Sequence, residues 1–201
     1  MQLLRIDASS RIENSDSRAI ADQFQQQWKN SHPNGIVITR DIIKTPIPHL
    51  HQKTIEGFYS AQKNLTSEQI EATALSDTLI SELKNTDVLL LSTPMYNFGV
   101  PSALKAWIDH ISRINKTFRV SDEGSFIGML ENIKAYIIIT AGAVYTSDEM
   151  KALDFVNPYL RAILGLIGIT DITFLSLEGT TMDPNTYEIM KEKALQTIAT
   201  I

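Results

Sequence analysis

The stretch DVLLLSTPMYNFGVPSALKAWIDHI, residues 87–111, decides the fold of this chain. It opens with a run of Val and Leu, which is typical of a strand buried on both faces. It closes with apolar residues at helical spacing, namely Ala103, Leu104, Trp107, Ile108 and Ile111. The turn between them, residues 95–98, carries three large apolar side chains and one amide. A strand that leads through a short turn into a helix is the unit of a parallel α/β sheet.

The same unit recurs along the rest of the chain. Apolar runs predict five strands, at residues 3–8, 35–42, 87–93, 135–141 and 171–177. Their strict alternation with helical patterns predicts one domain, residues 1–201. We expect a doubly wound five-stranded parallel sheet of order 2-1-3-4-5, with helices on both faces. Its ligand site would lie at the carboxyl ends of strands 1, 3 and 4.

Local signals place several helix ends. Thr66 and Gln69 form a capping box that begins one helix, and Asp183 followed by Pro184 begins the last one. The pattern over residues 148–167 predicts a single helix that contains Pro158.

Composition excludes several classes of function. The net charge of -5 argues against a nucleic-acid binder, which needs a basic face. The chain has no cysteine, which excludes disulfides, zinc-thiolate sites and a thiol nucleophile and fits the cytoplasm. No apolar run is long enough to span a membrane. His49 and His51 lack a carboxylate cluster nearby, so we predict no metal site.

The loop after the first strand, DASSRIENSDSR, points to a phosphate. Its serine hydroxyls are hydrogen-bond donors, Arg11 adds charge, and the helix that follows offers free N–H groups. The alternative is that Ser15 or Ser17 only caps that helix. The loop contains neither GxGxxG nor GxxxxGK[ST], so a phosphomonoester fits better than a dinucleotide or a nucleoside triphosphate.

Two further loops should meet the first one. The PMYNF loop suits a flat apolar ring, with Asn97 at the polar rim of the ring. The alternative is a core plug beneath residues 43–65. After the fourth strand, Gly142 and its small neighbours would let backbone approach a ligand closely, although an ordinary turn would look the same. A phosphate on one loop and a planar ring between two others describe FMN.

Two connections, residues 43–65 and 115–133, are too long for simple turns. The second contains Phe118 and Phe126, and we expect these to wall a partner subunit's flavin in a homodimer. The alternative is local packing under a surface loop.

PMYNF followed by GVPSALK, with S-x(5)-S-x-S in the first loop, resembles the FMN-dependent NADH:quinone oxidoreductases known as azoreductases. The resemblance continues in order through LTSEQIEATALSDTLISELKNTDVLLLSTPMYNF, TFRVSDEG and YLRAILGLIGITDITF. It implies a flavodoxin-like fold and a homodimer. Two departures leave contacts and substrate preference open. Residues 140–143 are Thr-Ala-Gly-Ala where many members have Ser-Arg-Gly-Gly, and Val120 replaces an aromatic residue.

The resemblance also implies roles for residues. Ser9, Ser15, Asp16 and Ser17 would hold the FMN phosphate, Asp16 through its backbone N–H. Together with the reading of the residues, the predicted cofactor-binding set is Ser9, Arg11, Ser15, Asp16, Ser17, Pro94, Met95, Tyr96, Asn97, Phe98, Thr140, Ala141, Gly142 and Ala143.

The implied reaction is ping-pong. NADH or NADPH would give a hydride to flavin N5, and a quinone or azo compound would then take two electrons. The flavin carries this chemistry, so we predict no catalytic residue and give Asn97 a supporting role. The alternatives are a flavodoxin-like electron carrier, a general NAD(P)H:FMN reductase, and a phosphomonoester-binding protein of another kind.

Overall fold

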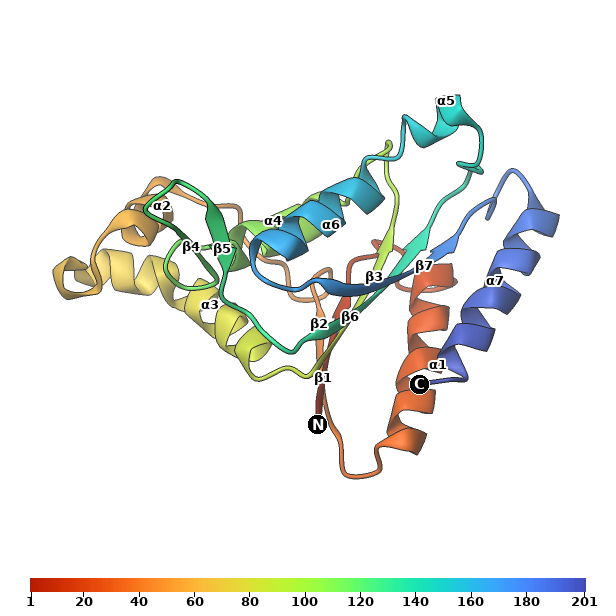
Figure 1. Cartoon of the computed structure of the whole chain (residues 1–201), viewed down its shortest axis with the longest axis horizontal. Coiled ribbons are helices and arrows are strands. Elements are labelled where there is room, and N and C mark those ends of the chain that lie inside the picture. Colours follow the sequence, from red (N-terminus) through yellow and green to blue (C-terminus); the bar gives the residue numbers. More distant parts are fainter.

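Five parallel strands form one sheet in the computed structural model, which describes residues 1–201 (Figure 1). The strands are β1 (Gln2–Asp7), β2 (Ile36–Asp41), β3 (Val88–Pro94), β6 (Lys134–Thr140) and β7 (Asp171–Leu177). Their order is β2-β1-β3-β6-β7, and every neighbouring pair is parallel. The predicted order 2-1-3-4-5 is therefore confirmed, because β6 and β7 are the fourth and fifth strands of the sheet.

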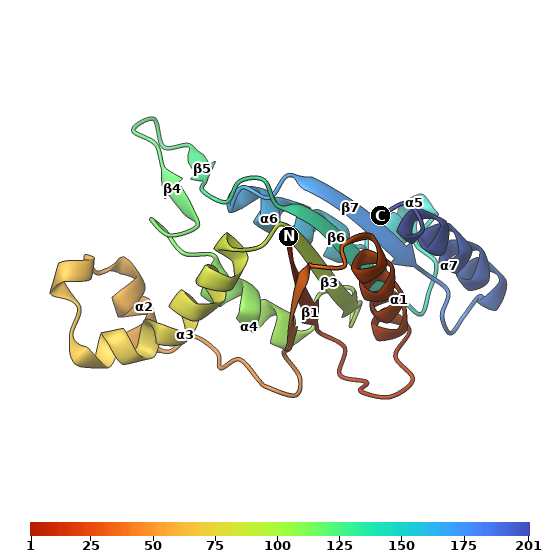
Figure 2. The same cartoon turned by 90° about the horizontal axis from the view of Figure 1, so that it is seen from below.

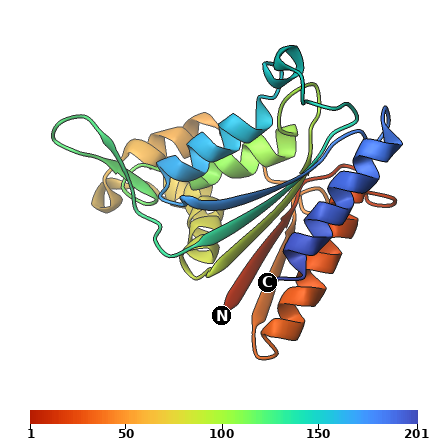
Figure 3. The same ribbon diagram turned by 45° about the vertical axis from the view of Figure 1, so that its right-hand side comes forward.

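Helices cover both faces of this sheet, as Figure 3 shows. The helices are α1 (Asp16–Ser31), α2 (Gln52–Tyr59), α3 (Ser67–Lys84), α4 (Ser102–Ile111), α5 (Asp148–Lys151), α6 (Val156–Leu166) and α7 (Pro184–Ile198), with a 3₁₀ turn, η1, at Gln62–Asn64. None of them is long and apolar enough to cross a membrane.

Two apolar clusters fill the two sides of the sheet. The larger has 25 buried residues and joins the strands to α3, α4 and α6. The smaller has 13 buried residues and joins the strands to α1 and α7. Strand β3 contributes to both because its side chains alternate between the faces, and all seven of its residues are buried.

The predicted caps are confirmed. The Thr66 hydroxyl accepts from the Gln69 N–H and the Gln69 side chain accepts from the Thr66 N–H, so the capping box begins α3. The Asp183 carboxylate accepts from the Thr186 N–H, and Pro184 is the first residue of α7.

The single helix predicted over residues 148–167 is wrong. The chain forms the short α5, leaves the helix after Lys151, and begins α6 at Val156. The cause is Asp154, whose carboxylate accepts from the N–H groups of Val156 and Asn157 and so starts a new helix. Pro158 is then the third residue of α6, a position where its missing N–H breaks no helical hydrogen bond.

Both long connections are structured. Residues 43–65 contain α2 and η1, and α2 packs closely on α3: a Cβ added at Gly57 would lie 2.7 Å from the Thr73 side chain. Residues 115–133 contain an antiparallel hairpin of β4 (Phe118–Val120) and β5 (Phe126–Gly128). The hairpin follows the end of α4 and precedes the start of β6, so it stands at the amino edge of the sheet, away from α7 (Figure 2).

Candidate functional site

A cavity of about 180 Å³ lies at the carboxyl edge of the sheet. Residues from all three predicted loops line it together with a fourth loop: Ser9, Arg11, Ser15, Asp16, Pro94, Met95, Tyr96, Thr140, Gly142, Thr180 and Thr181. The loops after β1, β3 and β6 therefore converge as the strand order requires. Five predicted residues do not line it: Ser17, Asn97, Phe98, Ala141 and Ala143.

The serine loop, residues 8–15, ends with hydroxyl groups that the chain leaves available. Ser15 occupies the N-cap position of α1 with an extended backbone, but its side chain makes no capping hydrogen bond. Its hydroxyl lies 3.3 Å from the hydroxyl of Ser17, which is fully buried. The alternative of a simple cap thus describes the position of Ser15 but not what its hydroxyl does.

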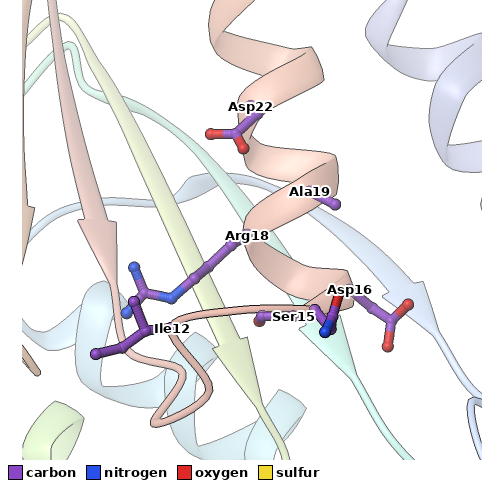
Figure 4. Close-up of a pocket in the computed structure, with 7 residues that line it drawn as sticks. Ile12, Ser15, Asp16, Arg18, Ala19 and Asp22 are labelled. Carbon is purple, nitrogen blue, oxygen red and sulfur yellow. The ribbon is translucent and has the colours of Figure 1, made fainter.

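The carboxylate of Asp16 has a partner on another helix. It accepts a hydrogen bond of 2.7 Å from the Tyr187 hydroxyl on α7. Burial and this hydrogen bond raise the pKa of Tyr187 above its usual range. The first N–H groups of α1 have no partner inside the helix, so the backbone of Asp16 remains a donor while its side chain is occupied. Figure 4 shows Ser15 and Asp16 together at the start of this helix.

The PMYNF turn has a backbone that the sequence did not reveal. Tyr96 and Gly99 exchange two backbone hydrogen bonds of 3.0 Å, which close a tight turn. The two residues at its tip, Asn97 and Phe98, have φ of 49° and 67°. Positive φ at both central positions is the type I′ arrangement; Asn tolerates it well, but a bulky Phe does so only with strain. The Phe98 carbonyl accepts a hydrogen bond from the Phe155 N–H, which helps to hold Phe98 in this conformation.

The side chains of this turn divide between core and surface. Met95 is half-buried and packs against the larger core cluster while it also lines the cavity. Tyr96 and Phe98 are 39% and 42% exposed. The core-plug alternative therefore describes one face of Met95, and Tyr96 and Phe98 keep a large part of their surface exposed.

Residues 140–143 are bound to the loop after β7. The Ala141 carbonyl accepts from the N–H of Thr180 at 3.1 Å, and the Gly142 carbonyl accepts from the N–H of Thr181 at 3.3 Å. The N–H groups of Gly142, Ala143 and Val144 make no hydrogen bond within the chain. These donors belong to the loop and not to a helix start, because α5 begins only at Asp148.

The packing of the chain does not explain why residue 142 is a glycine. A Cβ added there would meet the Thr181 hydroxyl at 3.4 Å, an ordinary contact, and its φ is not in the left-handed region. Gly142 lines the cavity and places only backbone there.

Sequence reasoning missed Thr180 and Thr181. The Thr180 hydroxyl donates to the Ala141 carbonyl at 3.2 Å, whereas the Thr181 hydroxyl has no partner in the chain. The strand-order rule directs attention to the loops after β1, β3 and β6, and nothing in the EGTTM segment stands out by itself. Its only signal is that it follows the edge strand next to β6.

Phe118 and Phe126 lie away from this cavity. Their rings meet edge to face, with centroids 5.9 Å apart, and Phe118 also packs on the larger core cluster. Phe126 is 67% exposed. The hairpin that carries them leaves the amino edge of the sheet (Figure 1). The cavity lies at the carboxyl edge. Local packing thus accounts for Phe118 but not for Phe126. His49 and His51 line a different cavity, and no group of three possible ligands for a metal forms.

Buried charges lie beneath the serine loop. Arg18 of α1 donates to the carboxylate of Asp41, at the end of β2, with a shortest distance of 2.7 Å. Burial by itself would raise the pKa of Asp41, but the hydrogen bonds from Arg18 and from the N–H groups of Lys44 and Ile43 outweigh it and lower that pKa to about 2. The loop therefore rests on groups that are ionised at neutral pH.

Known proteins match this chain over its full length. The Flavodoxin_2 family model, described as a flavodoxin-like fold, matches residues 1–201. An FMN-dependent NADH:quinone oxidoreductase of Hydrogenovibrio crunogenus is 42% identical over 196 residues, which cover 98% of this chain and 96% of that relative. One from Herminiimonas arsenicoxydans is 40% identical over 181 residues, covering 90% and 88%. A crystal structure of azoreductase from Bacillus anthracis str. Sterne superposes with a TM-score of 0.90 at 26% identity, covering 100% of this chain and 97% of that one. The chain therefore belongs to the flavodoxin-like family of FMN-dependent NADH:quinone oxidoreductases and azoreductases that its motifs resemble.

Proposed function

We propose that this protein is an FMN-dependent oxidoreductase that passes two electrons from NADH or NADPH to quinones and azo compounds. The observation that carries the proposal is the cavity in which three separate loops bring together hydroxyl groups, apolar side chains and unpartnered N–H groups. Relatives at about 40% identity carry the same activity in their names. When bound, FMN would supply the chemistry by taking a hydride and handing on both electrons.

The start of α1 fits the phosphate end of this cofactor. The hydroxyls of Ser15 and Ser17 lie 3.3 Å apart and bond to nothing else in the chain. The N–H of Asp16 is available because it belongs to the first turn of α1, and the carboxylate of Asp16 is engaged by Tyr187. A dianionic phosphate would accept from all of these, at the positive end of the helix.

The other two loops fit a flat ring with one polar edge. Met95 and Tyr96 offer apolar surface in the cavity. Asn97, next to them in the turn but outside the cavity lining, would bring an amide that both donates and accepts. Across the cavity, the free N–H groups of Gly142 and Ala143 would donate to the polar edge of the ring. These loops would orient the ring and exclude water from it, and we assign no residue a proton-transfer role.

We further propose that the protein acts as a homodimer, in which the hairpin of one protomer closes the flavin site of the other. An exposed Phe126 at the edge opposite the cavity supports this, because the hairpin does not reach the cavity of its own chain. The cytoplasm stays the predicted location, on the strength of the sequence alone.

The test begins with the purified protein. We expect it to bind FMN, seen as the flavin absorbance bands after reconstitution, and to oxidise NADH in the presence of a quinone. An electron carrier would bind FMN but show no steady-state turnover with either nicotinamide cofactor. A general NAD(P)H:FMN reductase would release reduced FMN instead of retaining it. Failure to bind FMN at all would refute the assignment.

The dimer is tested separately. Sedimentation should give twice the chain mass of 22.5 kDa. Phe126→Ala should lower kcat/KM for a quinone while FMN affinity stays unchanged, with the exposed Tyr59→Ala as the control outside the hairpin. A fully active monomer would contradict the proposal.

A further inference from the structure

A network of buried charges fixes the end of β1. Asp7 is 3% exposed and accepts from the Arg5 side chain at 3.0 Å and from the Ser92 hydroxyl at 2.6 Å. It is thus paired from its own strand and from β3. Arg18 belongs to α1, and its guanidinium lies 3.6 Å from the same carboxylate, so it connects the helix to this network.

Arg18 makes one contact that the pairing of charges does not require. Besides its ion pair with Asp41, it donates from Nη2 to the backbone carbonyl of Ser9 at 2.8 Å. Figure 4 shows its side chain extending from α1 toward Ile12, on the other side from Asp16. Arg18 is therefore the one charged side chain that ties α1 and the end of β2 to the backbone of the serine loop.

This contact sets the direction of one N–H group. A trans peptide is planar, so its C=O and N–H point in opposite directions. Because the Ser9 carbonyl points at Arg18, the N–H of Ser10 points away from it, and that N–H has no partner in the chain. Ser9, which precedes this peptide bond, and Arg11, the residue after Ser10, both line the cavity.

We propose that Arg18 is a positioning residue for the cofactor phosphate: it holds the Ser9–Ser10 peptide so that the Ser10 N–H is kept free as a phosphate donor. The inference rests on the proposed function. It assigns Arg18 no contact with the cofactor, because its guanidinium is already occupied by Asp41 and the Ser9 carbonyl.

The test compares FMN with riboflavin, which has the same ring and no phosphate. Both affinities are measured on apoprotein by quenching of flavin fluorescence. Arg18→Gln should weaken FMN binding about 10-fold, as expected for loss of one charge-assisted hydrogen bond, and leave riboflavin binding within about 2-fold. A general structural defect would weaken both flavins alike, so the FMN to riboflavin ratio isolates positioning.

Two more variants sharpen this test. Arg18→Lys keeps the charge but has no planar fork to hold Asp41 and a carbonyl together, so an intermediate loss of about 3-fold for FMN is expected. Full FMN affinity in Arg18→Lys would show that charge alone matters. Arg40→Gln is the matched control, because it breaks a similarly buried ion pair, with Glu82, from β2 and does not touch the serine loop. The ratio of FMN affinity to riboflavin affinity in Arg40→Gln should equal that of the wild type.

The outcomes separate the two proposals. Wild-type protein that binds FMN, with an unchanged FMN to riboflavin ratio in Arg18→Gln, overturns the role of Arg18 alone. Wild-type protein that binds neither flavin overturns the proposed function and this role with it. Should Arg18→Gln fail to fold by circular dichroism, Arg18→Lys decides the matter, and an equal loss for both flavins would overturn the role.

Discussion

The serine loop and the PMYNF turn lie on two sides of one cavity, but different forces hold them. The serine loop is held from outside: Arg18 binds its Ser9 carbonyl, and the Asp41 partner of Arg18 belongs to another strand. The PMYNF turn is held from within, by two backbone hydrogen bonds between Tyr96 and Gly99. One loop depends on distant side chains and the other on its own backbone.

The two loops should respond differently to substitution. In the serine loop, the hydroxyls can be removed without changing the backbone, because Ser15 and Ser17 make no structural hydrogen bond beyond their mutual one. In the turn, side chain and backbone are linked, since Asn97 both presents an amide and adopts positive φ. Substitutions should therefore separate binding from folding in the first loop and mix them in the second.

The largest expected effect is on the first loop. Replacing Ser15 and Ser17 together by Ala should weaken FMN binding by about 3 kcal/mol, or about 100-fold, because two hydroxyl bonds to a charged acceptor are lost. FMN should be lost on dialysis while the thermal midpoint of the apoprotein changes little. The measurement is flavin retained per chain, by absorbance.

Ser81→Ala is the control for this double variant. Ser81 is an exposed serine of α3 that does not line the cavity. It should retain FMN like the wild type. Undiminished retention in the double variant would show that the two serines serve only the helix end.

The turn should show a smaller, mixed effect. Asn97→Ala removes the amide and puts Ala at φ of 49°, a conformation that costs a residue with a Cβ about 1 kcal/mol. We expect a loss of about 10-fold in flavin affinity or hydride-transfer rate, together with lower stability. Stopped-flow reduction by NADH and chemical denaturation measure the two parts.

Asn97→Gly separates those parts, because Gly accepts positive φ without strain. It should keep the stability of the wild type and still lose the contribution of the amide. Normal flavin affinity and kinetics in both variants would mean that the amide has no role. A loss in Asn97→Ala alone would assign the whole effect to the backbone.

A third loop allows a finer test of the same contrast. Gly142→Ala should leave stability unchanged or raise it by about 0.5 kcal/mol, because the chain has room for the methyl group and the unfolded state loses freedom. FMN affinity should nevertheless fall about 5-fold, roughly 1 kcal/mol, if the ring approaches this backbone. Isothermal titration with FMN measures it, and unchanged affinity would place the ring elsewhere.

The sequence predicts what is local and periodic. Long runs of Val, Ile and Leu predict the five strands, and the structure confirms them. The caps at Thr66 and Asp183 are predictable because each is a short local pattern. The type I′ turn at Asn97 and Phe98 is not predictable from the sequence, because the usual signal is Asn-Gly and here a Phe occupies the second position. That strained geometry is set by the surrounding structure, to which a sequence pattern does not point.

Other parts of the site depend on residues far apart in sequence. Arg18 and Asp41 are 23 positions apart, and their pairing requires β1 and β2 to lie side by side with α1 above them. Thr180 and Thr181 enter the cavity only because the loop after β7 binds residues 141–142. The single helix predicted over residues 148–167 is wrong because a local feature, Asp154, competes with the apolar period.

The smallest expected effect concerns the support of the serine loop. The pKa of Asp41 is lowered to about 2, so its ion pair with Arg18 stabilises the folded state above the pKa of the unfolded chain, near 4. That contribution is lost as the pH falls from about 4 through 2.

In Arg18→Gln the pKa of Asp41 should move back toward its ordinary value, and the fall in stability across this window should be shallower by under about 1 kcal/mol. Urea denaturation of both proteins at pH 5 and at pH 3 measures the difference, and Arg40→Gln provides the matched ion-pair control. Equal slopes in wild type and Arg18→Gln would mean that the N–H groups of Ile43 and Lys44 alone hold Asp41 ionised, and that the serine loop rests on backbone as the PMYNF turn does.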